Sequence, residues 1–195
     1  MKKILLVLSV LTVLASCGVN RQTREIKTLG KCKYDLRSID SVYVAGVALN
    51  KIINQNTIDL SSAPSIALGL LRQNIPFEGR VNLEIDNPTT SRAAINQFEY
   101  IILLQQKQLA EGVVNQKVSV EAGQTTVVPV KLKANVYELL TNGQLDQTLR
   151  ALKSDKDDAG LLTIKIKPVI YVGSTAIKYP GYITIDKKIS RSILL

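Results

Sequence analysis

Apolar and polar residues alternate with a period of two through most of the chain after residue 38. In the clearest stretch, Val81, Leu83 and Ile85 fall on one side and the polar residues between them fall on the other. The same alternation recurs at Phe98, Tyr100, Ile102 and Leu104; at Val118 and Val120; at Val128, Val130 and Leu132; at Leu162, Ile164 and Ile166; and at Ile183 and Ile185. With a further run over Val42–Leu49, the pattern predicts an antiparallel β-sandwich of seven or eight half-buried strands.

Two segments depart from this alternation and predict helices. In the first, Ser62 can cap a short helix with Pro64 in its first turn, and its apolar positions are Ile66, Leu70 and Leu71. The second has a helical face interrupted at Asn142-Gly143 and made of Val136, Leu139, Leu140, Leu145, Leu149 and Leu152. We therefore expect one or two helices, the second covering one opening of the sandwich.

The first sixteen residues have the pattern of an export signal. Lys2 and Lys3 precede an apolar run that is shorter than the ~20 residues needed to span a bilayer core. The run ends in Leu14–Cys17, a Leu-Ala-Ser-Cys sequence that resembles the lipobox of bacterial lipoproteins. The resemblance implies cleavage before Cys17 and acylation of its thiol, and two or three acyl chains hold a protein durably in a membrane. We expect a signal peptide over residues 1–16 and a lipid anchor at Cys17.

Residues 17–37 are polar and show no clear period, so they predict a tether that leads to a single sandwich domain over residues 38–195. Gly18 replaces the aspartate that tends to keep acylated proteins at an inner membrane, and the tether lacks an acidic run. The outer membrane, on its periplasmic face, is the expected location. Once Cys17 is acylated, Cys32 is the only other cysteine, so an unreactive, buried thiol is expected there.

Candidate catalytic chemistry is scarce. The chain has no histidine, which removes the commonest general base and metal ligand, and it has no Gly-rich phosphate loop or nucleophile motif. Asp155–Asp158 resembles the start of a calcium loop, but Ala159 and Ile166 stand where ligands are needed. We expect neither enzyme activity nor a bound cofactor or metal.

Positive charge distinguishes the chain, with a net charge of +9 that becomes +7 when the signal and its two lysines are removed. Many of the basic residues lie on the polar side of predicted strands: Lys131, Lys133, Lys165, Lys167, Lys187, Lys188 and Arg191. A solvated sheet face explains them, and attraction to anionic lipid headgroups is the alternative. Tyr171, Tyr179 and Tyr182 surround a Pro-Gly turn and serve either packing or ligand contact. An exported chain without interleaved aromatics is not expected to bind nucleic acid.

A family resemblance rests on the order of five segments: a strand closing on Asp86-Asn87-Pro88, a strand through Phe98–Tyr100, then Leu109–Gly112, Val120–Gly123 and Thr126–Val130. This order is similar to the type 2 late embryogenesis abundant domain, also called the water-stress and hypersensitive-response domain. The resemblance implies an immunoglobulin-like or fibronectin-like sandwich with a helix, and a role in stress protection. Asn50–Pro76 has no counterpart in the family pattern.

Two functions remain open from the sequence. The first is a non-catalytic, membrane-anchored envelope lipoprotein that works as a structural or interaction module, and this function predicts a filled core. The second is a periplasmic lipid-binding or lipid-transfer domain, which predicts an apolar groove beside the second helix. The residues expected to line or widen that groove are Leu139, Leu140, Leu145, Leu149, Ala134, Gly143 and Ala151.

Overall fold

The computed structural model describes residues 24–54, 63–154, 159–172 and 175–194. Its strands are β1 (Lys33–Val44), β2 (Val47–Ala48), β3 (Pro76–Asp86), β4 (Ala93–Ile95), β5 (Gln97–Leu104), β6 (Lys107–Val114), β7 (Val118–Val120), β8 (Thr125–Asn135), β9 (Leu161–Val172), β10 (Thr175–Lys178) and β11 (Ile183–Lys188). Its labelled helices are α2 (Leu49–Asn54), α3 (Pro64–Leu71), α4 (Tyr137–Thr141), α5 (Gln144–Lys153) and α6 (Arg191–Leu194). The fold is mainly β, as the alternation predicts.

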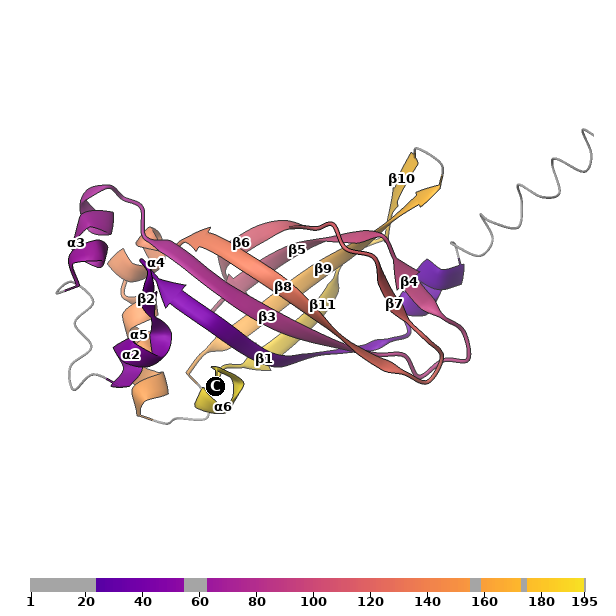
Figure 1. The fold of residues 1–195 in the computed structure, drawn as a ribbon, viewed down its shortest axis with the longest axis horizontal. Helices are drawn as coiled ribbons and strands as arrows, with labels where there is room; N and C mark the ends of the chain where they lie inside the picture. The colour runs from indigo at the N-terminus through magenta and orange to yellow at the C-terminus, as the bar shows by residue number, and fades with distance from the viewer. Residues whose placement is uncertain (1–23, 55–62, 155–158, 173–174, 195) are drawn as a thin grey trace, which may run out of the picture.

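Two antiparallel sheets form the body of the molecule (Figure 1). One has the order β2-β1-β3-β8, and the other has the order β10-β9-β5-β6, with β11 also paired to β9. β10 and β11 lie along the same strand and are separated by the turn at Tyr179–Tyr182. A small sheet of β4 and β7 lies at one end of the body, and α2 to α5 lie at the other (Figure 1).

The inward positions of the strands form the core, as predicted. Val81, Leu83 and Ile85 on β3 are almost fully buried, and so are Phe98 and Ile102 on β5. The described residues hold eleven strands rather than seven or eight. β2, β4 and β10 are two to four residues long and show too few alternations to be recognised, and β6 buries only Ala110, so it shows no alternation either.

The strand predicted over Val42–Leu49 is wrong in its limits. β1 ends at Val44, β2 covers two residues, and α2 begins at Leu49. Between the strands, Ala45 and Gly46 have φ angles of 48° and 78°. Two successive residues with positive φ make the tight turn that suits a hairpin, so the apolar run folds back on itself instead of continuing.

The predicted tether over residues 17–37 is also too long. Residues 24–29 form a helix, and β1 begins at Lys33 rather than at Ser38. Ile26 and Leu29, one helical turn apart, are buried in the core. The packed domain therefore starts by residue 24, and Cys17 lies outside the described residues.

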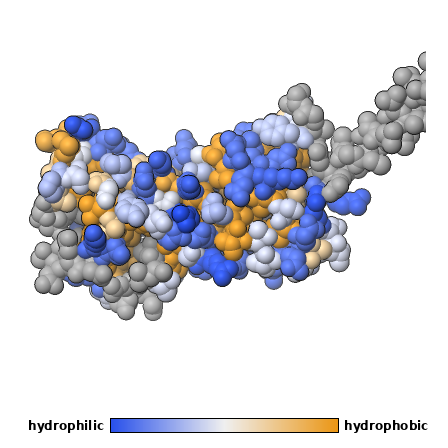
Figure 2. Space-filling model, in the orientation of Figure 1, coloured by the Kyte–Doolittle hydropathy of each residue, from blue (hydrophilic) through white to orange (hydrophobic). Residues whose placement is uncertain are grey.

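Both predicted helical segments are helical, but the first differs from the prediction in its N-cap residue and in its buried face. α3 has Pro64 in its first turn, but its N-cap is Ala63, and Ser62 lies outside the described residues. Ile66 is fully buried, whereas Leu71 is 84% exposed, so the predicted apolar face is only partly used. Figure 2 shows apolar side chains gathered at the corner where α3 lies. The stretch from Asn50 to Pro76, unplaced on the family pattern, thus supplies α2, α3 and the start of β3.

The second predicted helix is a pair. α4 and α5 meet at Gly143, whose φ of 78° needs the freedom of glycine. Leu145, Leu149 and Leu152 on α5 are buried at the predicted spacing. The pair lies across one end of the sandwich, as expected (Figure 1).

One buried amide organises the turn after β3. Asn87 is fully buried, and its side-chain NH2 group donates to the carbonyls of Ser91, Val120 and Glu121 at 2.9–3.1 Å. Its side-chain oxygen accepts from the backbone N–H and the hydroxyl of Thr89 at 3.1 and 2.7 Å. This residue therefore joins the ends of β3 and β7 to the loop between them.

Candidate functional site

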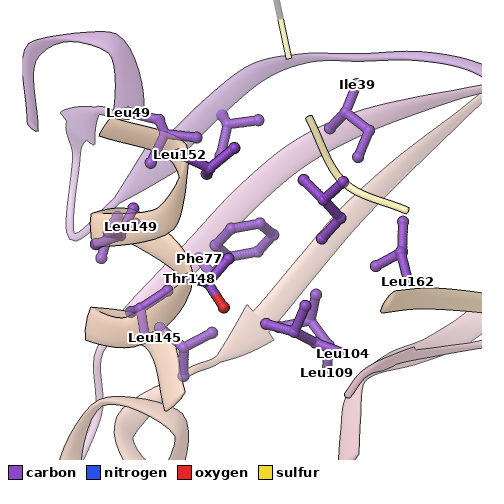
Figure 3. Close-up of a pocket in the computed structure, with 14 residues that line it drawn as sticks. Ile39, Leu49, Phe77, Leu104, Leu109, Leu145, Thr148, Leu149, Leu152 and Leu162 are labelled. Carbon is purple, nitrogen blue, oxygen red and sulfur yellow. The ribbon is translucent and has the colours of Figure 1, made fainter. Parts of the chain in front are cut away.

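An apolar pocket lies between α5 and the adjacent end of the sandwich (Figure 3). Its volume is about 70 Å³. It is lined by Ile39, Val42, Val44, Leu49, Phe77, Leu104, Leu109, Val136, Leu145, Thr148, Leu149, Leu152, Leu162 and Ile189. These residues come from strands and helices that are distant in the sequence, so the pocket is a product of the tertiary fold.

The wall on α5 follows directly from helical spacing. Leu145, Leu149 and Leu152 occur at i, i+4 and i+7 and therefore share one face of the helix. Thr148 is the one polar residue in the lining, and its hydroxyl donates to the carbonyl of Gln144 at 3.0 Å. Because that hydrogen bond is satisfied within the helix, the pocket offers no free polar partner. A lining of this kind favours an apolar group over a polar one.

The opposite wall is made where strands of both sheets end. Phe77 lies at the start of β3, and Leu104 and Leu109 flank the hairpin between β5 and β6. Phe77 and Leu109 are only half-buried. The pocket is therefore not sealed on this side.

The predicted groove residues are partly confirmed. Leu145 and Leu149 line the pocket, whereas Leu139 and Leu140 on α4 do not. The small residues expected to make room, Ala134, Gly143 and Ala151, are also absent from the lining. The turn at Gly143 separates the two apolar faces, so α4 packs on the core beside the pocket rather than around it.

The volume limits the ligand. A dry engineered cavity of ~150 Å³ binds benzene, so a pocket about half that size takes a few carbon atoms. The end of an acyl chain or a small branched hydrocarbon group fits. A complete lipid tail does not fit unless α5 or the sheet edge moves.

The tyrosine and lysine residues of β9 to β11 form a separate surface at the other end. Tyr182 lies under the Lys167 ammonium at 4.9 Å from its ring centre, and the Tyr171 hydroxyl donates to the Gln97 side-chain carbonyl at 3.1 Å. Both rings are exposed, at 44% and 36%. Tyr179 differs, because it is half-buried against Gly30 and serves packing. The three tyrosines are thus not one patch.

Two of the lysines singled out from the sequence form ion pairs. Lys133 on β8 pairs with Glu78 on β3 at 3.2 Å, and Lys187 on β11 pairs with Asp35 on β1 of the other sheet at 2.8 Å. Such exposed pairs add little stability. They agree with the solvated sheet faces that the sequence favours.

Cys32 is buried, as expected. Burial, and then the nearby carboxylate of Asp86, raise the pKa of the Cys32 thiol to about 11. The Cys32 thiol donates to the Thr28 carbonyl at 3.5 Å. It therefore serves the core rather than chemistry.

The described residues show neither a metal-binding cluster nor a membrane-spanning helix. The described part of the chain has no cluster of carboxylate or thiol groups that could hold a metal ion. The acidic stretch Asp155–Asp158 lies outside it. Among the described helices, none is long and apolar enough to cross a membrane.

A family model for late embryogenesis abundant proteins, LEA_2, matches residues 82–180, just over half of the chain. The chain belongs to this family, which confirms the resemblance drawn from its strands and turns. No curated protein matches the chain significantly.

Solved structures resemble the chain at low identity. A crystal structure from Archaeoglobus fulgidus is 16% identical, covers 59% of this chain and 85% of its own, and has a TM-score of 0.36. A solution structure from Arabidopsis thaliana is 14% identical, covers 60% and 70% respectively, and has a TM-score of 0.39. A solution structure of a protein proposed to be a late embryogenesis abundant protein is 14% identical, covers 95% and 91%, and has a TM-score of 0.33.

Proposed function

We propose that this chain is a non-catalytic lipoprotein of the bacterial envelope, anchored through acylated Cys17, whose LEA_2 domain binds a small apolar group. The anchor is supported by the charged start, the apolar run and the Leu-Ala-Ser-Cys sequence of residues 1–17. The outer membrane, on its periplasmic face, remains the proposed location. The observation that carries the binding function is the apolar pocket beside α5.

The pocket supports the second of the two functions that the sequence leaves open. A plain structural or interaction module predicts a filled core, and the space lined by Leu145, Leu149 and Phe77 departs from that expectation. The volume of about 70 Å³ favours the binding of an acyl-chain end over the carriage of a whole lipid. A stress-protective role stays a proposal that rests on the family alone.

Binding is tested by calorimetry of the mature chain with linear fatty acids of increasing length. Each buried methylene adds about 0.8 kcal/mol, so the affinity should rise with chain length and level off once the pocket is full. Thr148→Phe places a ring in the pocket and should abolish binding without loss of stability. Gln147→Phe, on the exposed side of the same helix, is the matched control and should bind normally.

Two results would contradict the binding function. One is the absence of binding heat at every chain length, which would leave the interaction module as the better function. The other is equal binding by Thr148→Phe and the parent chain, which would place the ligand elsewhere.

The anchor is tested separately. The thiol of Cys17 is the acyl acceptor, so Cys17→Ser should abolish labelling with a radioactive fatty acid and leave unprocessed precursor in the inner membrane. Normal acylation of that variant would refute the lipoprotein assignment. Membrane fractionation of the parent chain then tests its outer-membrane location.

A further inference from the structure

The exposed hairpin of β9 and β10 lies at the end of the molecule where the described chain begins (Figure 1). Tyr179, which follows β10, packs directly on Gly30, just after the first helix. A Cβ atom on Gly30 would clash with the Tyr179 hydroxyl oxygen, so this glycine permits the close approach. The hairpin and the N-terminal helix are therefore fixed to each other.

The hairpin carries large apolar and aromatic groups in water. All four residues of β10 are exposed, and Ile177 is 44% exposed. Tyr171 and Tyr182 are exposed on the same side as Lys167, which β-strand alternation places with Lys165. Lys178 also lies beside this surface and pairs with Glu99. The hairpin thus exposes aromatic rings and a cluster of lysines on one face, and Ile177, which pairs with Ile170, on the other face.

The length of the preceding chain sets how far this surface can lie from the anchor. Cys17 precedes the first described residue by seven positions, and seven residues extend at most about 24 Å. Since Gly30 holds the hairpin at this same end, acyl chains on Cys17 would keep the hairpin beside the bilayer.

We propose that the β9–β10 hairpin is a membrane contact that enters the headgroup boundary of the bilayer holding Cys17 edge-on, with Ile177 on one face and Tyr171 on the other, and that Tyr182 lies against the headgroups beside it. Tyrosine is favoured at that boundary because its ring is apolar and its hydroxyl is polar. Lysines at its edge are attracted by anionic headgroups. The inference rests on the proposed anchor.

The test uses the acylated full chain in vesicles of phosphatidylethanolamine and phosphatidylglycerol. Ile177→Cys carries a nitrobenzoxadiazole label, which is selective because Cys17 is acylated and Cys32 is buried. Leu71→Cys, 84% exposed on α3 at the opposite end, is the control. With brominated lipids, the label at position 177 should lose several times more fluorescence than the label at position 71, and its emission should shift to the blue. Equal quenching at the two positions would overturn the proposal.

Two further measurements distinguish a failed lipid anchor from a hairpin that does not contact the membrane. Mass spectrometry of the same sample reports whether Cys17 is acylated, so a failed anchor is recognised independently of the hairpin. The mature chain carrying Cys17→Ser, made without the signal, should still float with anionic vesicles, and Lys165→Gln with Lys167→Gln should reduce that flotation several-fold. A blue shift at position 177 without any vesicles would show that another protein chain covers the open edge of β10, which would also overturn the proposal.

Discussion

Asn87 offers the sharpest test of how the fold is held together. Its fully buried side chain makes three donated and two accepted hydrogen bonds across the end of the sandwich. Asn87→Ala removes all five and leaves buried carbonyl groups without this partner. Each lost bond costs about 0.5–1.5 kcal/mol, and a buried group left unpaired costs about 1–3 kcal/mol. We expect a loss of roughly 3–4 kcal/mol, a large part of the ~5–15 kcal/mol typical of a domain.

Asn87→Asp adds a pH dependence to the same test. The new carboxylate would face three carbonyl oxygens, so burial and repulsion raise its pKa in the folded chain. Below the unfolded pKa of about 4 the carboxyl is protonated in both states, and the extra penalty is small. As the pH rises above that value, the unfolded state ionises first and the folded chain loses stability. Asn87→Asp should therefore be less stable than Asn87→Ala at pH 7 and approach it near pH 4.

The assay is urea unfolding of the mature chain, followed by circular dichroism at both pH values. Asn82→Ala is the control, since that half-buried side chain on β3 donates two bonds to Ser38 and Asp40 on an outer face. It should cost about 1 kcal/mol. If Asn87→Ala cost no more than this control, or if the difference between the two Asn87 variants did not change with pH, the account of this turn would be wrong.

Two substitutions and the chemistry of Cys32 test the packing of the core. Gly112→Ala would place a Cβ atom 2.7 Å from the Tyr100 hydroxyl oxygen, so the free energy of unfolding measured in urea should fall by about 1–3 kcal/mol. Adding Tyr100→Phe to that variant removes the hydroxyl and should restore part of the lost stability. Leu149→Ala on α5 should cost about 2–5 kcal/mol and enlarge the pocket, and stronger binding of branched hydrocarbons would confirm the second effect. Burial raises the pKa of the Cys32 thiol to about 11, so iodoacetamide should modify this thiol slowly at pH 8 and faster at higher pH. Mass spectrometry measures the modified fraction over time. Fast modification of the native chain at pH 8 would contradict the burial of Cys32. Ionisation of the unfolded thiol above its pKa of 9.0 should also lower the stability of the fold between pH 9 and 11.

The strands that the sequence predicts correctly share a long alternation. β3, β5 and β8 each have three or more buried positions at i, i+2 and i+4, which only a half-buried strand explains. The errors occur where the signal is short. Ile26 and Leu29 give a single helical turn, too little to distinguish a packed helix from a polar tether. The turn at Ala45 depends on a positive φ at a residue that rarely adopts it.

The helix pair could be predicted, but the pocket beside it could not be built from the sequence. Leu145 and Leu149 were recognisable because helical spacing puts them on one face. Phe77 and Leu162 were not, because their place depends on which strand ends meet beneath that face. A cavity is a small difference between the space enclosed and the side-chain volume that fills it, and local patterns do not fix that difference.

The positions of the pocket and the hairpin restrict where the pocket can take its ligand from when Cys17 is anchored. Helix α5, which lines the pocket, and the β9–β10 hairpin lie at opposite ends of the sandwich (Figure 1). β8 connects these ends and has eleven residues, which corresponds to about 35 Å of extended strand. With the hairpin on the membrane, the pocket would face away from that membrane by about this distance, beyond the reach of its acyl chains. A ligand would then come from the aqueous envelope or from a facing partner. Binding of fatty acid supplied from solution, but not from the vesicle that holds the anchor, would distinguish this arrangement from extraction of lipid by the domain from its own membrane.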